Sequence, residues 1–156
     1  MLTEGALAYI RKHLKILSGF YGVLSPFDGV VPYRLEMQAK LSVDGKKDLY
    51  DFWCDKLYRH VSEQAEVILN LASKEYSIAI EKYLSAKVRY ITCIFGELQD
   101  GKIRQKGTFA RMARGEMVRF LAENGITEPE QVREFDGLGY RFAKGYSSES
   151  EFVFLK

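Results

Sequence analysis

Apolar residues recur every three or four positions in several stretches of the chain, which is the spacing of one face of an α-helix. In the first stretch Thr3 is a candidate N-cap, Glu4 follows in the first turn, and the apolar positions continue to Leu17. Near the other end, Thr127 opens a capping box with proline in the first helical turn. The predicted helices cover residues 3–17, 47–61, 73–84 and 108–124, and a further short helix begins near residue 128.

Shorter apolar runs bounded by turn residues predict β-strands. Asp100-Gly101 predicts a hairpin turn, Asp44-Gly45 marks a second turn, and residues 30–37 look extended. The predicted strands cover residues 67–71, 88–95, 102–106, 140–142 and 152–155. This combination favours an α/β fold over residues 1–156, a single domain with a mixed β-sheet flanked by helices, and an α+β arrangement is the alternative.

Composition narrows the classes of protein that the chain can be. No apolar run approaches the roughly 20 residues that cross a bilayer, and charged residues such as Arg11 interrupt the start, where a signal peptide would be apolar. Cys54 and Cys93 are the only cysteines, and His13 and His60 are far apart in sequence. We therefore expect a cytoplasmic protein with reduced thiols, no metal site and no cofactor.

The distribution of charge is more informative than the net charge of +2. Residues 101–120 hold six basic residues against Glu116 alone, whereas residues 121–136 hold five acidic residues against Arg133 alone. A basic block next to an acidic one creates a local field that the net charge hides.

The basic block lies mostly on one predicted helix. At 100° per residue, Arg111, Arg114 and Arg119 fall within an arc of roughly 140°, and Gly115 lies inside that arc. Three guanidinium groups around a residue without a side chain suit a chain of phosphates. The alternative is a solvated basic face with no ligand.

Several motifs occur in the order in which they occur in the YaaA family of bacterial peroxide-stress proteins, which the chain resembles from about Tyr9 onward. They are the segments at residues 17–24, 32–37, 47–53, 70–76, 113–115 and 139–142, whose first two read Leu-Ser-Gly-Phe-Tyr-Gly-Val-Leu and Pro-Tyr-Arg-Leu-Glu-Met. The match does not include the family's N-terminal segment with its Ser-Pro-Ala-Lys motif. We therefore expect this chain to be the C-terminal majority of a YaaA-like protein. Ser25 stands where the family usually has arginine, and Cys54 where it usually has glycine.

The resemblance implies a cytoplasmic protein that helps cells to survive hydrogen peroxide by keeping free iron low. It also implies DNA binding through a basic cleft and a helix-hairpin-helix element, and attaches no defined reaction. Two segments are candidates for this hairpin, residues 17–22 and residues 124–127, and an ordinary helical C-cap glycine is the alternative for both. We prefer the first for DNA, with Lys12 and Lys15 beside Gly19, because the second precedes an acidic helix.

Two functions remain open at this point. The first is binding of duplex DNA with little sequence specificity, through Lys12, Lys15, Gly19, Arg111, Arg114, Gly115 and Arg119. The second is a small-molecule enzyme, in which Arg34, Glu36, Asn70 and Ser73 line one polar cleft with Arg114. The alternatives for the second set are a structural ion pair and a helix N-cap. The sequence leaves the oligomeric state open.

Overall fold

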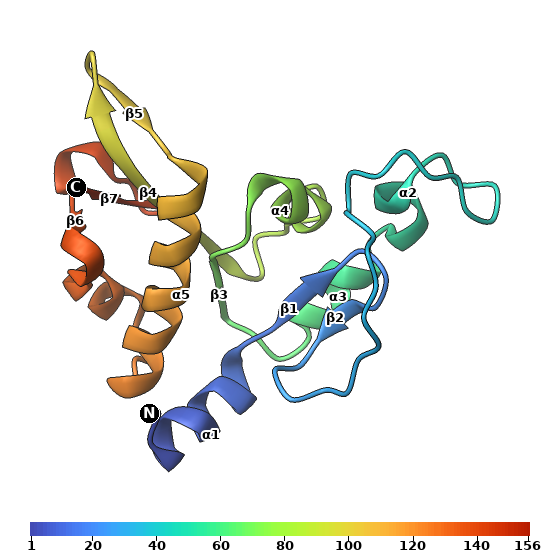
Figure 1. Cartoon of the computed structure of the whole chain (residues 1–156), viewed down its shortest axis with the longest axis horizontal. Coiled ribbons are helices and arrows are strands. Elements are labelled where there is room, and N and C mark those ends of the chain that lie inside the picture. Colours follow the sequence, from blue (N-terminus) through green and yellow to red (C-terminus); the bar gives the residue numbers. More distant parts are fainter. The chain divides into compact units, whose positions relative to one another are not determined.

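The contacts between residues group the chain into two compact units in the computed structural model, which describes residues 1–156 (Figure 1). The sheet unit comprises Met1–Lys12, Leu69–Leu71 and Tyr90–Lys156. The hairpin unit comprises His13–Ile68 and Ala72–Arg89. Each unit has buried apolar side chains of its own, among them Phe95 in the sheet unit and Leu57 in the hairpin unit. That the whole chain forms one domain stays a prediction.

The sheet unit holds most of the regular structure. Its elements are α1 (Glu4–His13), the end of β3 (Val67–Asn70), β4 (Arg89–Gln99), β5 (Lys102–Arg104), α5 (Gly107–Glu123), β6 (Arg141–Phe142) and β7 (Glu151–Leu155). Three short 3-10 helices complete it: η1 (Pro129–Glu134), η2 (Gly137–Gly139) and η3 (Lys144–Tyr146).

The strands form a mixed sheet in the order β3-β4-β7-β6, with β5 also paired to β4. β4 and β7 run parallel, with Cys93 opposite Phe152 and Phe95 opposite Phe154, whereas β5 and β6 pair antiparallel with their neighbours. The predicted α/β class with a mixed sheet is confirmed.

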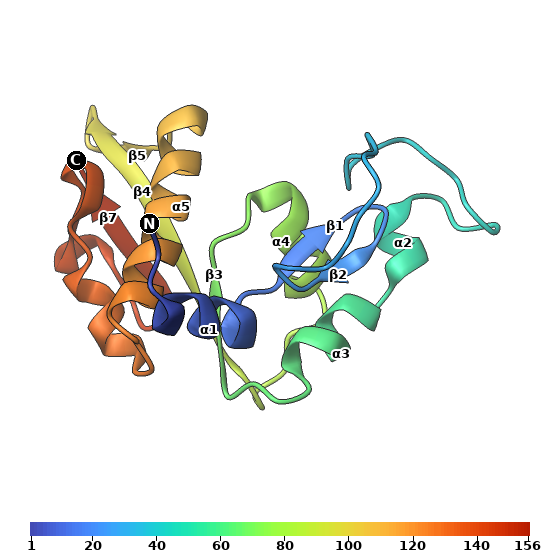
Figure 2. The same cartoon turned by 60° about the horizontal axis from the view of Figure 1, so that its bottom comes forward.

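α5 packs along this sheet and supplies much of the core (Figure 2). β4 buries Ile91, Cys93 and Phe95 because alternate residues of a strand face the same side. α5 meets them with side chains three or four positions apart, namely Ala110, Ala113, Met117 and Leu121. Burial raises the pKa of the Cys93 thiol from its ordinary value of 9.0 to about 12, so this thiol stays protonated and unreactive at neutral pH.

The hairpin unit is built on short elements. They are β1 (Ile16–Ser18), β2 (Gly22–Leu24), α2 (Leu49–Trp53), α3 (Lys56–Ser62), the start of β3, and α4 (Lys74–Glu81). β1 and β2 form an antiparallel hairpin, and α3 packs against both β2 and α4. None of the helices in the chain is long and apolar enough to cross a lipid bilayer.

Local signals predicted several elements correctly. The Thr3 hydroxyl accepts the Ala6 N–H at 3.1 Å and so caps α1 as expected. Both predicted turns have positive φ at their two central residues, Asp44-Gly45 and Asp100-Gly101, which is the geometry of a tight hairpin turn. The N-cap of η1 is Glu128 rather than Thr127.

Three predictions about residues 3–61 are wrong. The first helix ends at His13 and not at residue 17, because residues 16–18 pair with β2. Residues 30–37 form no strand. The predicted helix over residues 47–61 is two helices, α2 and α3, because Cys54 between them has φ 52° and ψ −129°, a conformation that suits glycine.

Candidate functional site

The basic face of α5 is the strongest candidate site, and we use this name for Arg111, Arg114, Gly115 and Arg119. The sequence places it opposite the buried stripe of the helix, so Arg111, Gly115 and Arg119 are exposed. Arg114 lies on the flank of that stripe and is partly buried. The predicted arc of basic residues is therefore present on the surface of the sheet unit.

The basic residues of this region differ in whether a carboxylate neutralises them. Arg119 Nε donates to Glu123 Oε1 at 2.7 Å, and this hydrogen bond raises the pKa of Arg119. Lys106 Nζ lies 3.0 Å from Glu97 Oε2. Arg111 and Arg114 form no ion pair in the structure, which leaves their two positive charges uncompensated.

Arg114 is the arginine of the basic face whose pKa is lowered by its surroundings. Burial lowers its pKa from the ordinary value, and the charge of Arg111 lowers it further. A guanidinium that is partly desolvated beside a second cation is less stable than one in water. An anion bound between Arg111 and Arg114 would relieve both effects, and a phosphate oxygen matches the geometry of their donors.

Gly115 adds space between these cations. A glycine inside a helix costs about 1 kcal/mol relative to alanine. A Cβ at Gly115 would meet no atom within 4 Å, so no packing contact of the chain requires a glycine at this position. Its N–H takes part in the helix's own hydrogen bonding, so the residue offers room for a ligand rather than a hydrogen-bond donor.

The predicted helix-hairpin-helix at residues 17–22 is wrong, because Gly19 lies in the turn between β1 and β2. A Cβ on Gly19 would lie 2.9 Å from the Leu35 carbonyl oxygen, which explains why a glycine stands there. Lys12 is exposed in the last turn of α1, and Lys15 is exposed just before β1. The other candidate, residues 124–127, joins α5 to the 3-10 helix η1.

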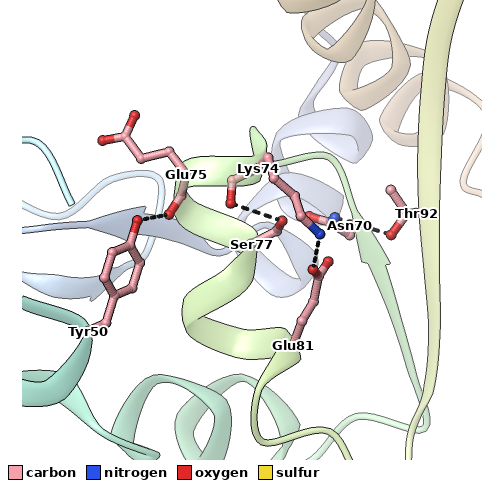
Figure 3. Close-up of polar contacts among 7 residues, drawn as sticks. All are labelled: Tyr50, Asn70, Lys74, Glu75, Ser77, Glu81 and Thr92. Atoms are coloured by element: carbon pink, nitrogen blue, oxygen red, sulfur yellow. Dashed lines mark hydrogen bonds and ion pairs between the residues drawn. The ribbon is translucent and has the colours of Figure 1, made fainter. Parts of the chain in front are cut away.

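The four candidate catalytic residues are divided between the two units. Arg34 and Glu36 belong to the hairpin unit, and Ser73 is the N-cap residue of α4 there, without a side-chain capping bond. Asn70 belongs to the sheet unit, where its side-chain amide donates to the Thr92 hydroxyl at 3.3 Å (Figure 3). That these residues share one cleft stays a prediction.

Sequence reasoning missed the polar contacts of α4. The Tyr50 hydroxyl donates to the Glu75 carbonyl oxygen at 2.6 Å, and Lys74 pairs with Glu81 at 2.7 Å (Figure 3). Burial and then the Glu75 charge raise the pKa of Tyr50. The contact between Tyr50 and Glu75 spans 25 residues and has no local signal, whereas the pairing of Arg119 with Glu123 follows from their spacing of four.

No group of three or more histidine, cysteine, aspartate or glutamate side chains in the structure could hold a metal ion.

Comparisons with known proteins agree on one family. A family model described as "Peroxide stress protein YaaA" matches residues 1–145. A UPF0246 protein of Desulfitobacterium hafniense is 58% identical over 148 residues, which cover 95% of this chain and 59% of that protein. UPF0246 proteins of Lachnoclostridium phytofermentans and Pediococcus pentosaceus are 53% and 51% identical over 156 residues, which cover 61% and 62% of those proteins. The chain thus spans about three fifths of the length of these curated relatives.

Proposed function

Since the chain belongs to the YaaA family of peroxide stress proteins, we propose that it is a cytoplasmic DNA-binding protein of the peroxide response. It holds the phosphate backbone of duplex DNA on the basic face of α5. By covering the duplex, it helps to limit the damage that free iron and peroxide cause together.

The observation that carries this proposal is the pair of uncompensated guanidinium groups of Arg111 and Arg114. Surface arginines next to carboxylates, such as Arg59 with Asp55 at 3.2 Å, need no external partner. Arg111 and Arg114 instead lie close enough for each other's charge to matter, and Arg114 is partly buried. Such a pair is stabilised by a polyanion, because a bound phosphate supplies the missing negative charge.

The binding is directed to the backbone and carries little sequence specificity. Phosphate contacts fix a protein on the duplex, whereas base contacts read the sequence. Gly115 leaves room for the phosphate chain to cross α5 close to its axis, and Lys12 adds a further exposed cation in the sheet unit. The proposal assigns no role to a helical hairpin at Gly19, since that segment is a β-hairpin.

The alternative, a small-molecule enzyme that uses Arg34, Glu36, Asn70 and Ser73, has no observation in its favour. Arg34 and Glu36 are exposed, and Asn70 belongs to the other unit.

A salt titration tests the proposal. Binding of a fluorescent duplex is measured by anisotropy between about 50 and 200 mM salt, where counterion release makes affinity fall with a slope near −0.9 per neutralised phosphate. We expect a slope of about −2 or steeper. The Arg59→Ala variant, which loses one positive charge outside the basic face, should match the wild type. Absence of binding at low salt would contradict the proposal.

A further inference from the structure

A long loop of the hairpin unit joins β2 to α2 without forming a helix or a strand. It covers residues 25–48, and its only ladder contact is an isolated bridge between Val43 and Lys46. Loops of more than about 15 residues without regular structure are uncommon in compact domains and usually serve a function. Residues 30–37 of this loop were expected to be extended, and they have no partner strand in the chain.

The loop exposes apolar side chains instead of burying them. Val30 and Val31 are 50% and 70% exposed, and Tyr33 is 43% exposed. Phe20, in the turn between β1 and β2, is 56% exposed, and its ring lies 5.3 Å from that of Tyr33 between centroids. We call Phe20, Val30, Val31 and Tyr33 the apolar patch. Single exposed apolar residues are ordinary, whereas a group of them marks an interaction site.

Hydrogen bonds hold the apolar patch in this exposed position. The Val31 N–H donates to the Tyr21 hydroxyl at 2.9 Å, and the Tyr33 hydroxyl is hydrogen-bonded to the buried Ser18 hydroxyl. A little further along the loop, the Met37 side chain is fully buried. Because the path of the loop is fixed in this way, a partner that covers the patch orders few additional groups and loses little conformational entropy.

The centre of the apolar patch carries no charge. Residues 29–33 read Gly-Val-Val-Pro-Tyr, and the first charged residues along the chain are Asp28 on one side and Arg34 on the other. Protein interfaces are depleted of charge at their centre and enriched in aromatic residues, whereas nucleic acid sites need an excess of positive charge. The patch therefore suits an apolar polypeptide segment.

The longer relatives contain further polypeptide that could supply such a segment. The proteins of Lachnoclostridium phytofermentans and Pediococcus pentosaceus match this chain over all 156 residues, yet the match covers only 61% and 62% of their own lengths. A segment joined covalently to the matched part acts at a high effective concentration. It can therefore cover a small patch that would hold a separate partner only weakly.

We propose that the apolar patch is the docking site of the polypeptide segment that the longer relatives carry outside the matched region. The segment packs its apolar side chains on Phe20, Val31 and Tyr33 and removes them from water, which is the main favourable contribution to such contacts. This inference does not depend on DNA binding, since the patch belongs to the hairpin unit and the basic face of α5 belongs to the sheet unit.

The test joins that segment to the full chain. The part of the Lachnoclostridium phytofermentans protein outside the match is fused to this chain in the order that it has in the relative, and both forms are digested with trypsin. Arg34 is exposed directly after the patch, and Lys87 is exposed in a turn of the same unit. We expect cleavage after Arg34 to be about tenfold slower in the fusion, and cleavage after Lys87 to keep its rate. Equal slowing at both sites would reflect a general gain in stability and would overturn the inference.

Val31→Asp places a charge in the centre of the patch and should restore cleavage after Arg34 in the fusion to the rate of the chain alone. Since Val31 is 70% exposed, this substitution should leave the thermal melt of the chain alone unchanged, which verifies that the variant folds. The matched control is Met112→Asp, at a 53% exposed residue of α5 in the sheet unit, and it should keep the protection. Protection that persists in Val31→Asp would contradict the inference.

Two further outcomes separate this docking site from self-association and from the proposed function. If the fusion forms a dimer that Val31→Asp dissociates in sedimentation velocity, the apolar patch is a contact between copies and the inference is wrong. If the fusion is protected at Arg34 but the chain does not bind duplex DNA, the proposed function fails while the docking site stands.

Discussion

The two halves of α5 both carry arginines on the basic face but differ in what surrounds them. In the first half, Arg111 and Arg114 stand close together, without a carboxylate. In the second half, Arg119 donates to Glu123 at 2.7 Å. The three residues lie in one arc of roughly 140°, so the geometry of the helix alone does not distinguish them.

We infer from this difference that compensation by a carboxylate, rather than the count of charges, distinguishes the arginines that are available to an external anion. An exposed pair such as that of Arg119 and Glu123 contributes little to stability and still occupies the guanidinium. An unpaired and partly buried arginine keeps its donors available for a ligand. If the chain binds DNA as proposed, we expect the phosphate contacts in the first half of α5.

The largest expected effect is that of replacing Arg111 and Arg114 together by alanine. Because a hydrogen bond to a charged group contributes about 1.5 kcal/mol, loss of two such contacts should weaken duplex binding about a hundredfold at low salt. The salt slope should become shallower by about two. Anisotropy titrations measure both quantities. Arg59→Ala is the control for loss of one charge, and a similar loss in that variant would mean that binding follows the net charge only.

A smaller effect is expected for Gly115→Ala, and it has opposite signs for stability and for binding. The free energy of unfolding should rise by about 1 kcal/mol, because alanine favours the helix and its Cβ meets no atom of the chain. Duplex affinity should fall about fivefold, since the Cβ occupies the room for the phosphate chain. Chemical denaturation and anisotropy test the two parts. A stabilised variant with unchanged affinity would show that the phosphates do not approach Gly115.

Breaking the pair of Arg119 and Glu123 should change duplex affinity by a still smaller factor, and should raise the affinity rather than lower it. Glu123→Gln removes the carboxylate charge that holds Arg119 and keeps the size of the side chain. We expect duplex affinity to rise about threefold and the salt slope to steepen by no more than about 0.9. The same titrations measure both changes. No gain in affinity would place Arg119 outside the reach of the DNA.

Cys54→Gly should leave DNA binding unchanged and affect stability alone. Gly115 is a glycine at a helical position where no contact requires one. Cys54, in contrast, has a side chain although its backbone adopts φ 52° and ψ −129°, a conformation that suits glycine. Glycine adopts this conformation without steric cost, so the variant should be more stable by about 1 kcal/mol. Thermal melts measure the gain. An unchanged or lower midpoint would mean that the contact of Cys54 with the Tyr83 hydroxyl at 3.8 Å outweighs the backbone strain.

The parts of the fold that could be predicted depend on local signals. The β4–β5 hairpin follows from Asp100-Gly101, and α5 follows from its long apolar stripe. β1 could not be predicted from the sequence, because residues 14–17 continue the helical spacing of apolar residues. Only pairing with β2 makes residues 16–18 a strand. The break at Cys54 was likewise hidden, since cysteine carries no turn signal.

The candidate site likewise has features that follow from local sequence patterns and features that depend on tertiary packing. The arc of Arg111, Arg114 and Arg119 could be placed from the helical period alone. The partial burial of Arg114 depends on packing within the sheet unit, which no local pattern contains. The rings of Phe20 and Tyr33 lie 5.3 Å apart between centroids although the two residues are well separated in sequence, so this contact emerges only from the folded hairpin unit.

The most direct test compares the salt slopes of duplex binding in Arg119→Ala and in the Arg111/Arg114 double alanine variant with that of the wild type. The account predicts a slope shallower by about two in the double variant and almost unchanged in Arg119→Ala. Equal changes per removed arginine would contradict it, because all three residues would then contact phosphate regardless of Glu123.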